Sequence, residues 1–216
     1  MKLENVIVER PYKKVYRCDE GIAKVFEPSH PKEDVFNEAL NQARVEATGL
    51  NIPKVKSVNE IDGKWALVID YKEGKTLEEL MQENPDKMDE YMEQFVDLQL
   101  EIHSKTAPLL GKLKDKLNRQ INSLKDVVDA TTRYELLTRL DSMPKHHKVC
   151  HGDFNPSNVI VGEDGSLYVV DWAHATQGNA SADAAMTYLL FALKDQKLAD
   201  KYMDLFCRKS DTAKPY

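Results

Sequence analysis

Strand-like and helix-like segments are separated along this chain, and this separation limits the folds open to it. Short β-branched or aromatic runs fill most of the first part, for example Lys14 to Cys18, Ile22 to Phe26 and Trp65 to Ile69, and turn sequences join them. From Tyr71 onward the apolar residues recur mainly at helical spacing. The order of strands first and helices second predicts an α+β fold.

One helix is expected inside the strand-rich part. Ser29 and Pro31 mark its start, and Pro53 forbids its continuation. Its helical spacing comes from Phe36, Ala39, Leu40, Ala43 and Ala47. A boundary near Asp70 to Gly74 then separates a lobe over residues 1–71 from a mainly helical lobe over residues 72–216.

The helical part is predicted to contain six helices and a few short strands. The helices are expected from Thr76, whose pairing with Glu79 forms a capping box, and over Asp86 to Ser104, Asp115 to Val128, Thr132 to Leu140 and, in two segments, from about Ala180 to Cys207. The strands are expected at Val149-Cys150, at Val159 to Val161 and at Leu167 to Val170.

Charge and cysteine content narrow the class of protein. Thirty Lys and Arg against 36 Asp and Glu give a net charge of −6, which argues against a basic surface for nucleic acid or an anionic membrane. The three cysteines, Cys18, Cys150 and Cys207, have no CxxC spacing, so neither a disulfide framework nor a thiolate metal site is expected. No apolar run reaches the ~18 residues needed to span a bilayer, and the N-terminus lacks a signal sequence. These features predict a soluble cytoplasmic protein.

One short segment carries the chemistry. His151 to Asn158 reads His-Gly-Asp-Phe-Asn-Pro-Ser-Asn, and 13 residues later an apolar strand ends in Asp171-Trp172. Taken singly, Asp153 and Asn158 are ordinary turn residues. In this order, however, two carboxylates and an amide suit a metal–phosphate site, because hard oxygens bind Mg²⁺ and an unliganded carboxylate orients a hydroxyl.

This motif resembles that of the aminoglycoside phosphotransferase and choline kinase family. The resemblance implies a protein-kinase-like bilobal fold, with an antiparallel sheet and one helix in the N-terminal lobe and a mainly helical C-terminal lobe. It also implies ATP and Mg²⁺ as cofactors, and transfer of the γ-phosphoryl group to a hydroxyl of a small molecule. Asp153 would be the catalytic base, Asn158 and Asp171 the metal ligands, and His151 and Asp183 the structural supports of the catalytic loop.

For the nucleotide, the resemblance implies a lysine on the third strand and a glutamate on the following helix. Lys24 fills the first role; an ammonium in an apolar run needs a partner, for which Glu38 is favoured and Glu46 is the alternative. The adenine-binding strand and hinge would comprise Ile69, Asp70, Tyr71 and Lys72.

Two features depart from the family pattern. The turn from Glu9 to Lys14 has no glycine, whereas a phosphate-covering loop usually needs one. Lys13 and Lys14 either replace it as charges or are simply solvated. The chain also ends soon after the helix that contains Cys207, whereas family members commonly carry more helices around the acceptor pocket. That pocket is therefore expected to be open, completed by another chain, or missing because the sequence is a fragment.

The distribution of charge along the chain indicates what charge the phosphoryl acceptor should carry. Residues 72–101 carry ten acidic and three basic side chains, about −7, whereas residues 112–148 carry nine basic and five acidic ones, about +4. A basic insertion disfavours a polycationic aminoglycoside and predicts a neutral or singly cationic acceptor. The alternative is that these runs are solvated helix faces. His174 and Gln177 are further candidates for acceptor contacts, with ordinary loop roles as the alternative.

Other functions fit the sequence less well. The glycine-free turn favours an inactive ATP-binding regulatory module, but the presence of Lys24, Asp153, Asn158 and Asp171 speaks against it. A protein kinase would need a longer peptide-docking segment between Asp171 and Asp183. A pure interaction protein would bind no nucleotide.

A zinc site at His146-His147, Cys150 and His151 is disfavoured because strand alternation separates the last two. The acceptor's identity and the oligomeric state are not predicted.

Overall fold

The computed structural model describes residues 2–211, so Met1 and residues 212–216 of the two predicted lobes lie outside the described residues. The chain forms two compact units. The first unit comprises the chain up to Tyr91 together with Asn155–His174, and the second unit comprises Met92–Phe154 together with the chain from Ala175 onward. The contacts therefore group residues 72–91 and 155–174 with the strand-rich part, and the lobe boundary at residue 71 stays a prediction.

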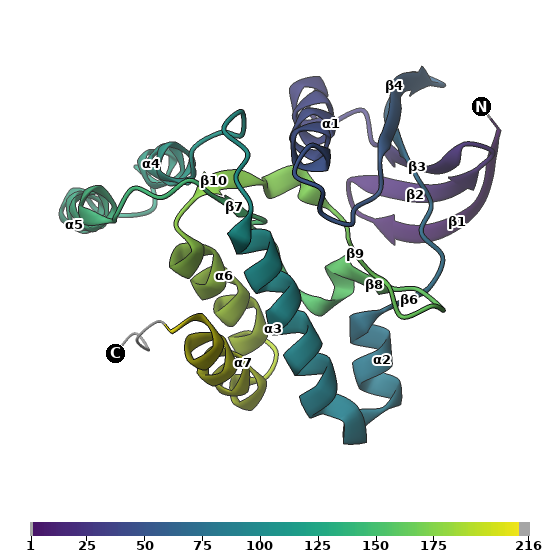
Figure 1. Ribbon diagram of the computed structural model, residues 1–216. Helices are drawn as coiled ribbons and strands as arrows, with labels where there is room; N and C mark the ends of the chain where they lie inside the picture. The colour runs from purple at the N-terminus through teal and green to yellow at the C-terminus, as the bar shows by residue number, and fades with distance from the viewer. Residues whose placement is uncertain (1, 212–216) are drawn as a thin grey trace. The chain divides into compact units, whose positions relative to one another are not determined.

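The first unit contains the predicted antiparallel sheet, which has five strands (Figure 1). Its strands are β1 (Leu3–Arg10), β2 (Lys13–Cys18), β3 (Gly21–Phe26), β4 (Val55–Ile61) and β5 (Lys64–Ile69), in the spatial order β1-β2-β3-β5-β4. The β4–β5 turn contains Asp62 and Gly63, both with positive φ, 49° and 74°. Such a turn matches the twist of a hairpin, which explains why the Asp-Gly sequence marks it.

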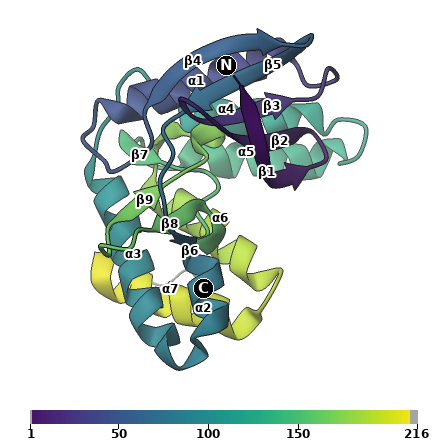
Figure 2. The ribbon, with the colours of Figure 1, turned by 90° about the vertical axis from the view of Figure 1, so that its right-hand side faces the viewer.

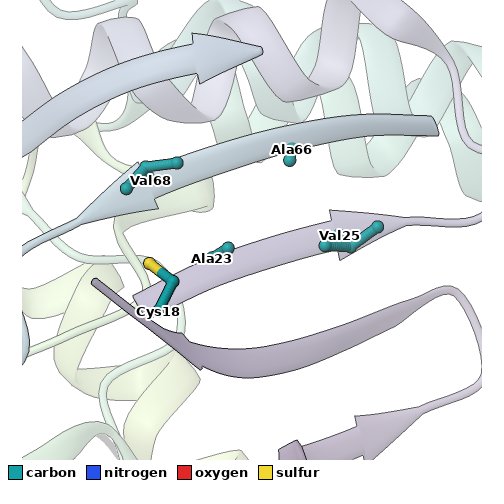
Figure 3. Close-up of a cluster of buried hydrophobic side chains, with 5 residues drawn as sticks. All are labelled: Cys18, Ala23, Val25, Ala66 and Val68. Carbon is teal, nitrogen blue, oxygen red and sulfur yellow. The ribbon is translucent and has the colours of Figure 1, made fainter. Parts of the chain in front are cut away.

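The two faces of this sheet bury different apolar sets. Alternation along β3 sends Ala23 and Val25 to one face, where they pack with Cys18 at the end of β2 and with Ala66 and Val68 of β5 (Figure 3). On the other face Phe26, Leu67 and Ile69 pack against Val35 and Ala39 of the helix α1 (Lys32–Glu46). Lys24 lies between Ile22 and Phe26 in β3 and therefore shares the face that α1 covers.

Helix α1 is present as predicted, but the apolar spacing that predicts it does not identify its buried side. Phe36 and Leu40 are 44% and 47% exposed, whereas the polar residues Glu38, Asn41 and Gln42 are buried. Each of these three has a partner inside the unit; the Gln42 amide, for example, donates to the carbonyl of Pro53 at 2.7 Å. Because a buried polar group is tolerated when it is hydrogen-bonded, the helix turns a polar stripe inward.

The rest of the first unit is a short helix and a small sheet (Figure 2). Helix α2 (Leu77–Glu83) begins with the predicted capping box of Thr76 and Glu79. Strands β6 (Lys75–Thr76), β8 (Val159–Val161) and β9 (Leu167–Val169) form the sheet in the order β6-β8-β9. Strand β6 has only two residues, so no alternation in the sequence could reveal it.

Three long helices make the core of the second unit: α3 (Met88–Ser104, whose first residues belong to the first unit), α6 (Ala180–Ala192) and α7 (Gln196–Ser210). The aromatic rings of Phe95, Phe154, Phe191 and Tyr202 pack together there, with the first two stacked at 4.3 Å between centroids. The Tyr202 hydroxyl donates to Gln99 at 2.6 Å, which satisfies a phenol that burial would otherwise penalise.

The remaining helices are peripheral. Helices α4 (Leu113–Ser123) and α5 (Ala130–Ser142) lie side by side in the second unit (Figure 1), and of their side chains only that of Leu140 is buried. Helix α4 ends at Ser123, five residues before the predicted end at Val128. Strand β7 (Lys148–Cys150) pairs with the short strand β10 (Thr176–Gly178), which the sequence analysis did not predict. Across residues 2–211, no helix has the length and apolar character needed to cross a membrane.

Candidate active site

A cavity of about 350 Å³ lies within the first unit. Apolar side chains cover part of its wall, and they are Ile7, Val8, Val15, Ile22, Ile69, Ile160 and Val170. Charged and polar side chains line another part, among them Lys13, Lys24, Asn158 and Asp171. The cavity thus combines an apolar wall with a set of convergent polar groups, which is the usual make-up of a small-molecule site.

Lys24 is buried with its ammonium group held between two carboxylates. Its Nζ donates to Glu38 Oε1 at 2.5 Å and to Asp171 Oδ1 at 3.0 Å. Burial alone would lower the pKa of Lys24, but the charges of Glu38 and Asp171 outweigh it and keep that pKa above its ordinary value. Lys24 therefore stays cationic in the wall of the cavity.

Glu46, the alternative partner for Lys24, lies in the last turn of α1 and makes a different contact. Its Oε1 accepts the backbone N–H of Val55 at 2.7 Å. This bond fixes the start of β4 to the end of α1. In the structure Lys24 therefore pairs with Glu38 and not with Glu46.

Asp171 is held in an unusual backbone conformation. Its φ is +66°, in the left-handed region that a residue with a side chain seldom adopts. Its carboxylate accepts from Lys24 and from Lys13, whose Nζ lies 3.3 Å from Oδ1 and 3.2 Å from Oδ2. The charge of Lys24, more than that of Lys13, holds the pKa of Asp171 well below its usual range despite its burial. Strain of this kind persists only where the surroundings enforce it, and it is concentrated at functional sites.

Lys13 and Lys14, for which the sequence left two roles open, have different environments. In the β2–β3 register Lys13 faces Phe26 and Val15 faces Lys24, so Lys13 shares the face of Lys24. Lys14 points to the opposite face, and its Nζ lies 2.7 Å from Glu9 Oε1. Lys13 lines the cavity, whereas Lys14 is a surface ion-pair residue.

The four predicted hinge residues all line the same cavity. Ile69 is buried, and its carbonyl oxygen would lie 2.2 Å from a Cβ at Gly21, so only glycine fits there. The Asp70 carboxylate is already paired with neighbouring groups: it accepts from Lys56 Nζ at 2.9 Å and from the Lys54 N–H at 3.2 Å. The Tyr71 ring is covered by the guanidinium of Arg17 at 3.7 Å. Lys72 Nζ lies 4.9 Å from the ring of Tyr168.

Asn158 lies in the first unit with Asp171. It ends a 3-10 turn (Pro156–Asn158), and its carbonyl accepts the N–H of Val170 at 2.9 Å, one residue before Asp171. The two side chains line one cavity. A carboxylate and an amide oxygen are ligand types that Mg²⁺ accepts, so the donor set fits this ion. Among residues 2–211 no group of three or more His, Cys, Asp and Glu side chains is arranged to hold a metal.

The loop that contains Asp153 begins in the second unit, and Asp183 of α6 holds it. The buried Asp183 carboxylate accepts the N–H of His151 at 3.1 Å and that of Gly152 at 2.7 Å. Gly152 has a φ of +80°, which a glycine adopts without strain. The N–H of Asp153 donates to His151 Nδ1 at 3.3 Å. These bonds fix the backbone on the N-terminal side of Asp153.

His103 also contacts Asp183, and the sequence analysis did not predict this partnership. His103 Nε2 lies 2.9 Å from Asp183 Oδ2, and both side chains are buried. Burial would raise the pKa of Asp183, but the hydrogen bond and charge of His103, with the bond from Gly152, hold that pKa below its ordinary value. The two residues are 80 positions apart, so no local sequence pattern predicts the pair.

Of the two candidates for acceptor contacts, His174 lies in the first unit and Gln177 in the second. The Gln177 amide donates to the carbonyls of Pro108 and Leu110 at 2.8 Å and 2.6 Å, and its Oε1 lies 3.1 Å from His147 Nδ1. These bonds anchor the segment before α4 to β10. Gln177 therefore has a structural task in the second unit.

Comparison with solved structures shows what this fold is similar to. An apo thermostable mutant of the aminoglycoside phosphotransferase APH(4)-Ia matches with a TM-score of 0.69 at 16% identity, over 97% of this chain and 80% of that one. An aminoglycoside-3'-phosphotransferase of type VIII matches with a TM-score of 0.68 at 16% identity, over 98% and 88%. The phosphotransferase APH(3'')-Id from Streptomyces rimosus matches with a TM-score of 0.66 at 18% identity, over 95% and 85%. The fold is thus the protein-kinase-like fold expected from the sequence.

Sequence comparisons give one match and one negative result. No curated protein matches the chain. The family model described as the phosphotransferase enzyme family matches residues 13–216, which include the loop of Asp153 and the cavity-lining residues from Lys13 onward. Because this match covers almost the whole chain, the chain belongs to the phosphotransferase enzyme family.

Proposed function

We propose that this protein is a small-molecule kinase that transfers the γ-phosphoryl group of ATP to a hydroxyl group. The observation that carries the proposal is the buried Lys24 ammonium, which is held between Glu38 and Asp171 in the wall of a partly apolar cavity. A buried lysine that is fully charged and fixed at two carboxylates is suited to positioning a phosphate chain. In this scheme residues 1–71 form the nucleotide-binding lobe, and residues 72–216 form the catalytic lobe.

On the nucleotide side, each group has a role in binding. The apolar side chains of Ile22 and Ile69, with the hinge from Asp70 to Lys72, receive the base. Lys24 binds the α- and β-phosphates and is positioned by Glu38. Mg²⁺, which Asn158 and Asp171 would hold, neutralises phosphate charge when it is bound.

On the acceptor side, Asp153 orients the hydroxyl group and takes its proton. The acceptor oxygen then forms a bond to the γ-phosphorus while the bond from that phosphorus to the ADP oxygen breaks, and ADP leaves with the electron pair. The bonds from His151 and Gly152 to Asp183 position this loop before the substrate arrives. Pre-positioning of this kind lowers the cost of aligning the reacting groups.

The acceptor is expected to be a small compound without multiple positive charges. Two of the similar structures hold hygromycin B and streptomycin, but in this chain one basic residue of α4, Lys116, interacts with the charge of Asp153. Partial burial lowers the pKa of Lys116, and this lysine also interacts with the charges of Asp183, Asp153 and Arg119. Cations close to Asp153 repel a polycation.

An acceptor screen tests the proposal. ADP release from MgATP is measured with amino alcohols, sugars and aminoglycosides, for the wild type and for Asp153→Asn as the matched control. We expect at least one neutral or singly charged alcohol to stimulate ADP release in the wild type and not in Asp153→Asn. ATP binding without release in the presence of any acceptor would favour the inactive regulatory module instead. Absence of ATP binding would contradict both.

A further inference from the structure

The hairpin between β1 and β2 borders the nucleotide-side cavity without offering a glycine. Arg10 pairs with Lys13 across a turn of two residues, Pro11 and Tyr12. Glycine-rich loops bind phosphates through closely approaching backbone N–H groups. Pro11 has no N–H to offer, so this turn is a poor backbone cradle for phosphate.

A side-chain cation stands at the end of this turn. Lys13 lines the cavity, and its Nζ lies within hydrogen-bond distance of both Asp171 oxygens, at 3.3 Å and 3.2 Å. It completes a row of alternating charges that runs from Glu38 through Lys24 and Asp171 to Lys13. The side chain of Lys24 is 6% exposed, whereas that of Lys13 is 22% exposed.

This difference gives the two ammonium groups different freedom to move. Lys24 is fixed by burial and by two carboxylates, so its ammonium cannot move far. Lys13 reaches Asp171 from a partly exposed strand end through four methylene groups, and within residues 2–211 Asp171 is the only carboxylate that pairs with it. A flexible ammonium with one partner is free to exchange that partner for a stronger anion.

We propose that Lys13 is a second phosphate-binding cation, which takes the place of the missing glycine-rich loop. This inference rests on the proposed function. The phosphate oxygens of a bound nucleotide compete with Asp171 for the Lys13 ammonium. When the Lys13 ammonium pairs with phosphate instead, the Asp171 carboxylate becomes available for a metal ion. The positive charge of Lys13 then faces the phosphate chain.

Lys14 supplies a matched control on the same hairpin. It follows Lys13 directly, but strand alternation turns it to the other face, where it pairs with Glu9. It lines a different cavity, with Tyr16 and Val25. Removal of either lysine changes the net charge equally, so only the position of the charge differs between the two variants.

The experiment measures nucleotide binding by isothermal titration calorimetry. MgATP, MgADP and adenosine are titrated into the wild type, Lys13→Ala, Lys13→Arg and Lys14→Ala, each first shown to be folded by circular dichroism. We expect Lys13→Ala to weaken ATP and ADP binding by about tenfold or more, the scale of a hydrogen bond to a charged group, and to leave adenosine binding unchanged. Lys13→Arg should recover most of the loss, and Lys14→Ala should bind all three ligands like the wild type.

The outcomes separate this inference from the proposed function. If the wild type binds MgATP and Lys13→Ala binds it equally well, the inference is wrong and the proposed function stands. An equal loss of adenosine and ATP binding in Lys13→Ala would also overturn the inference, because it would assign Lys13 to the local structure. A wild type that binds no nucleotide would overturn both.

Discussion

The charged row of the first unit and the α4–α5 pair of the second unit differ in how firmly their side chains are held. Glu38 and Lys24 are buried against each other, and Asp171 is bound by two ammonium groups. In α4 and α5, by contrast, only Leu140 is buried. A buried charge cannot lose its partner without a large cost, whereas an exposed helix face tolerates exchange. The charged row is therefore constrained by the packing around it. Under the proposed function, the exposed α4–α5 pair is where acceptor specificity would be free to vary.

The largest effect is expected at Asp153, which the proposal places on the acceptor side. Asp153→Asn keeps the shape of the side chain and removes its charge and basicity. We expect turnover with an identified acceptor to fall by about 10²–10⁴-fold while ATP affinity changes little. Steady-state kinetics and ATP titration of the same preparation measure the two quantities. Wild-type turnover in Asp153→Asn would show that the loop has only a structural role.

The next effect concerns the support of that loop. Asp183→Ala leaves the N–H groups of His151 and Gly152 and the buried His103 without their shared acceptor. We expect a loss of about 3–5 kcal/mol in the free energy of unfolding, measured by urea denaturation. Asp200→Ala, at an exposed position of α7, is the control and should cost less than about 1 kcal/mol. Equal losses in the two variants would remove the supporting role of Asp183.

Asp183 should also make the stability of the folded protein depend on pH. The pKa of Asp183 lies below its ordinary value of 3.8 in the folded protein, so its ionised form favours folding. Its contribution is fully present above about pH 3.8 and is lost as the pH falls through the lower folded pKa. The difference in stability between the wild type and Asp183→Ala should therefore shrink on acidification below pH 3.8. A difference that grows as the pH falls would contradict the direction of this shift.

A smaller effect distinguishes the two glutamates of α1. Glu38→Gln removes a charge that faces the buried Lys24, although Asp171 remains as its partner. We expect a loss of about 1–3 kcal/mol in unfolding free energy and weaker ATP binding. Glu46→Gln keeps an oxygen that can accept the Val55 N–H, so it should change both quantities little. Thermal denaturation and ATP titration compare the two variants. Larger losses in Glu46→Gln than in Glu38→Gln would indicate that Glu46 is the partner of Lys24.

The smallest effect is expected in the segment between α4 and α5. Val127 is 83% exposed. Val127→Ser should change the free energy of unfolding by less than about 0.5 kcal/mol and leave ATP binding unaltered. Urea denaturation provides the measurement. A loss above 2 kcal/mol would mean that this region is covered in solution and is not the tolerant surface described above.

The elements that sequence predicts best here are those with a long, regular pattern. The hairpins of the sheet and the long helices follow from alternation and helical spacing, and the structure confirms them. Strands β6 and β10 are two and three residues long, too short for any periodicity to show. The apolar spacing predicts α1 but does not identify its buried side, because Glu38 and Gln42 are buried with partners elsewhere in the chain while Phe36 and Leu40 are exposed.

In the site, too, contiguous motifs can be predicted from the sequence, whereas contacts between distant residues cannot. The loop from His151 to Asn158 is contiguous, so its residue types and order are visible in the sequence. The ion pair of Lys24 with Asp171 joins positions 147 apart, and the bond of His103 to Asp183 joins positions 80 apart. No local pattern encodes such distances; they follow from tertiary packing. Resemblance to a family can suggest the partners, but a choice such as Glu38 over Glu46 needs the structure.

The most direct test of the central claim, that the charges of the first unit form a metal-dependent nucleotide site, is the affinity for ATP in Mg²⁺ and in EDTA, measured for the wild type and for Asp171→Ala. The account predicts tight binding of ATP to the wild type in Mg²⁺, weaker binding in EDTA, and weak binding to Asp171→Ala under both conditions, because an uncompensated triphosphate is poorly held. Equal ATP affinity under all four conditions would contradict it.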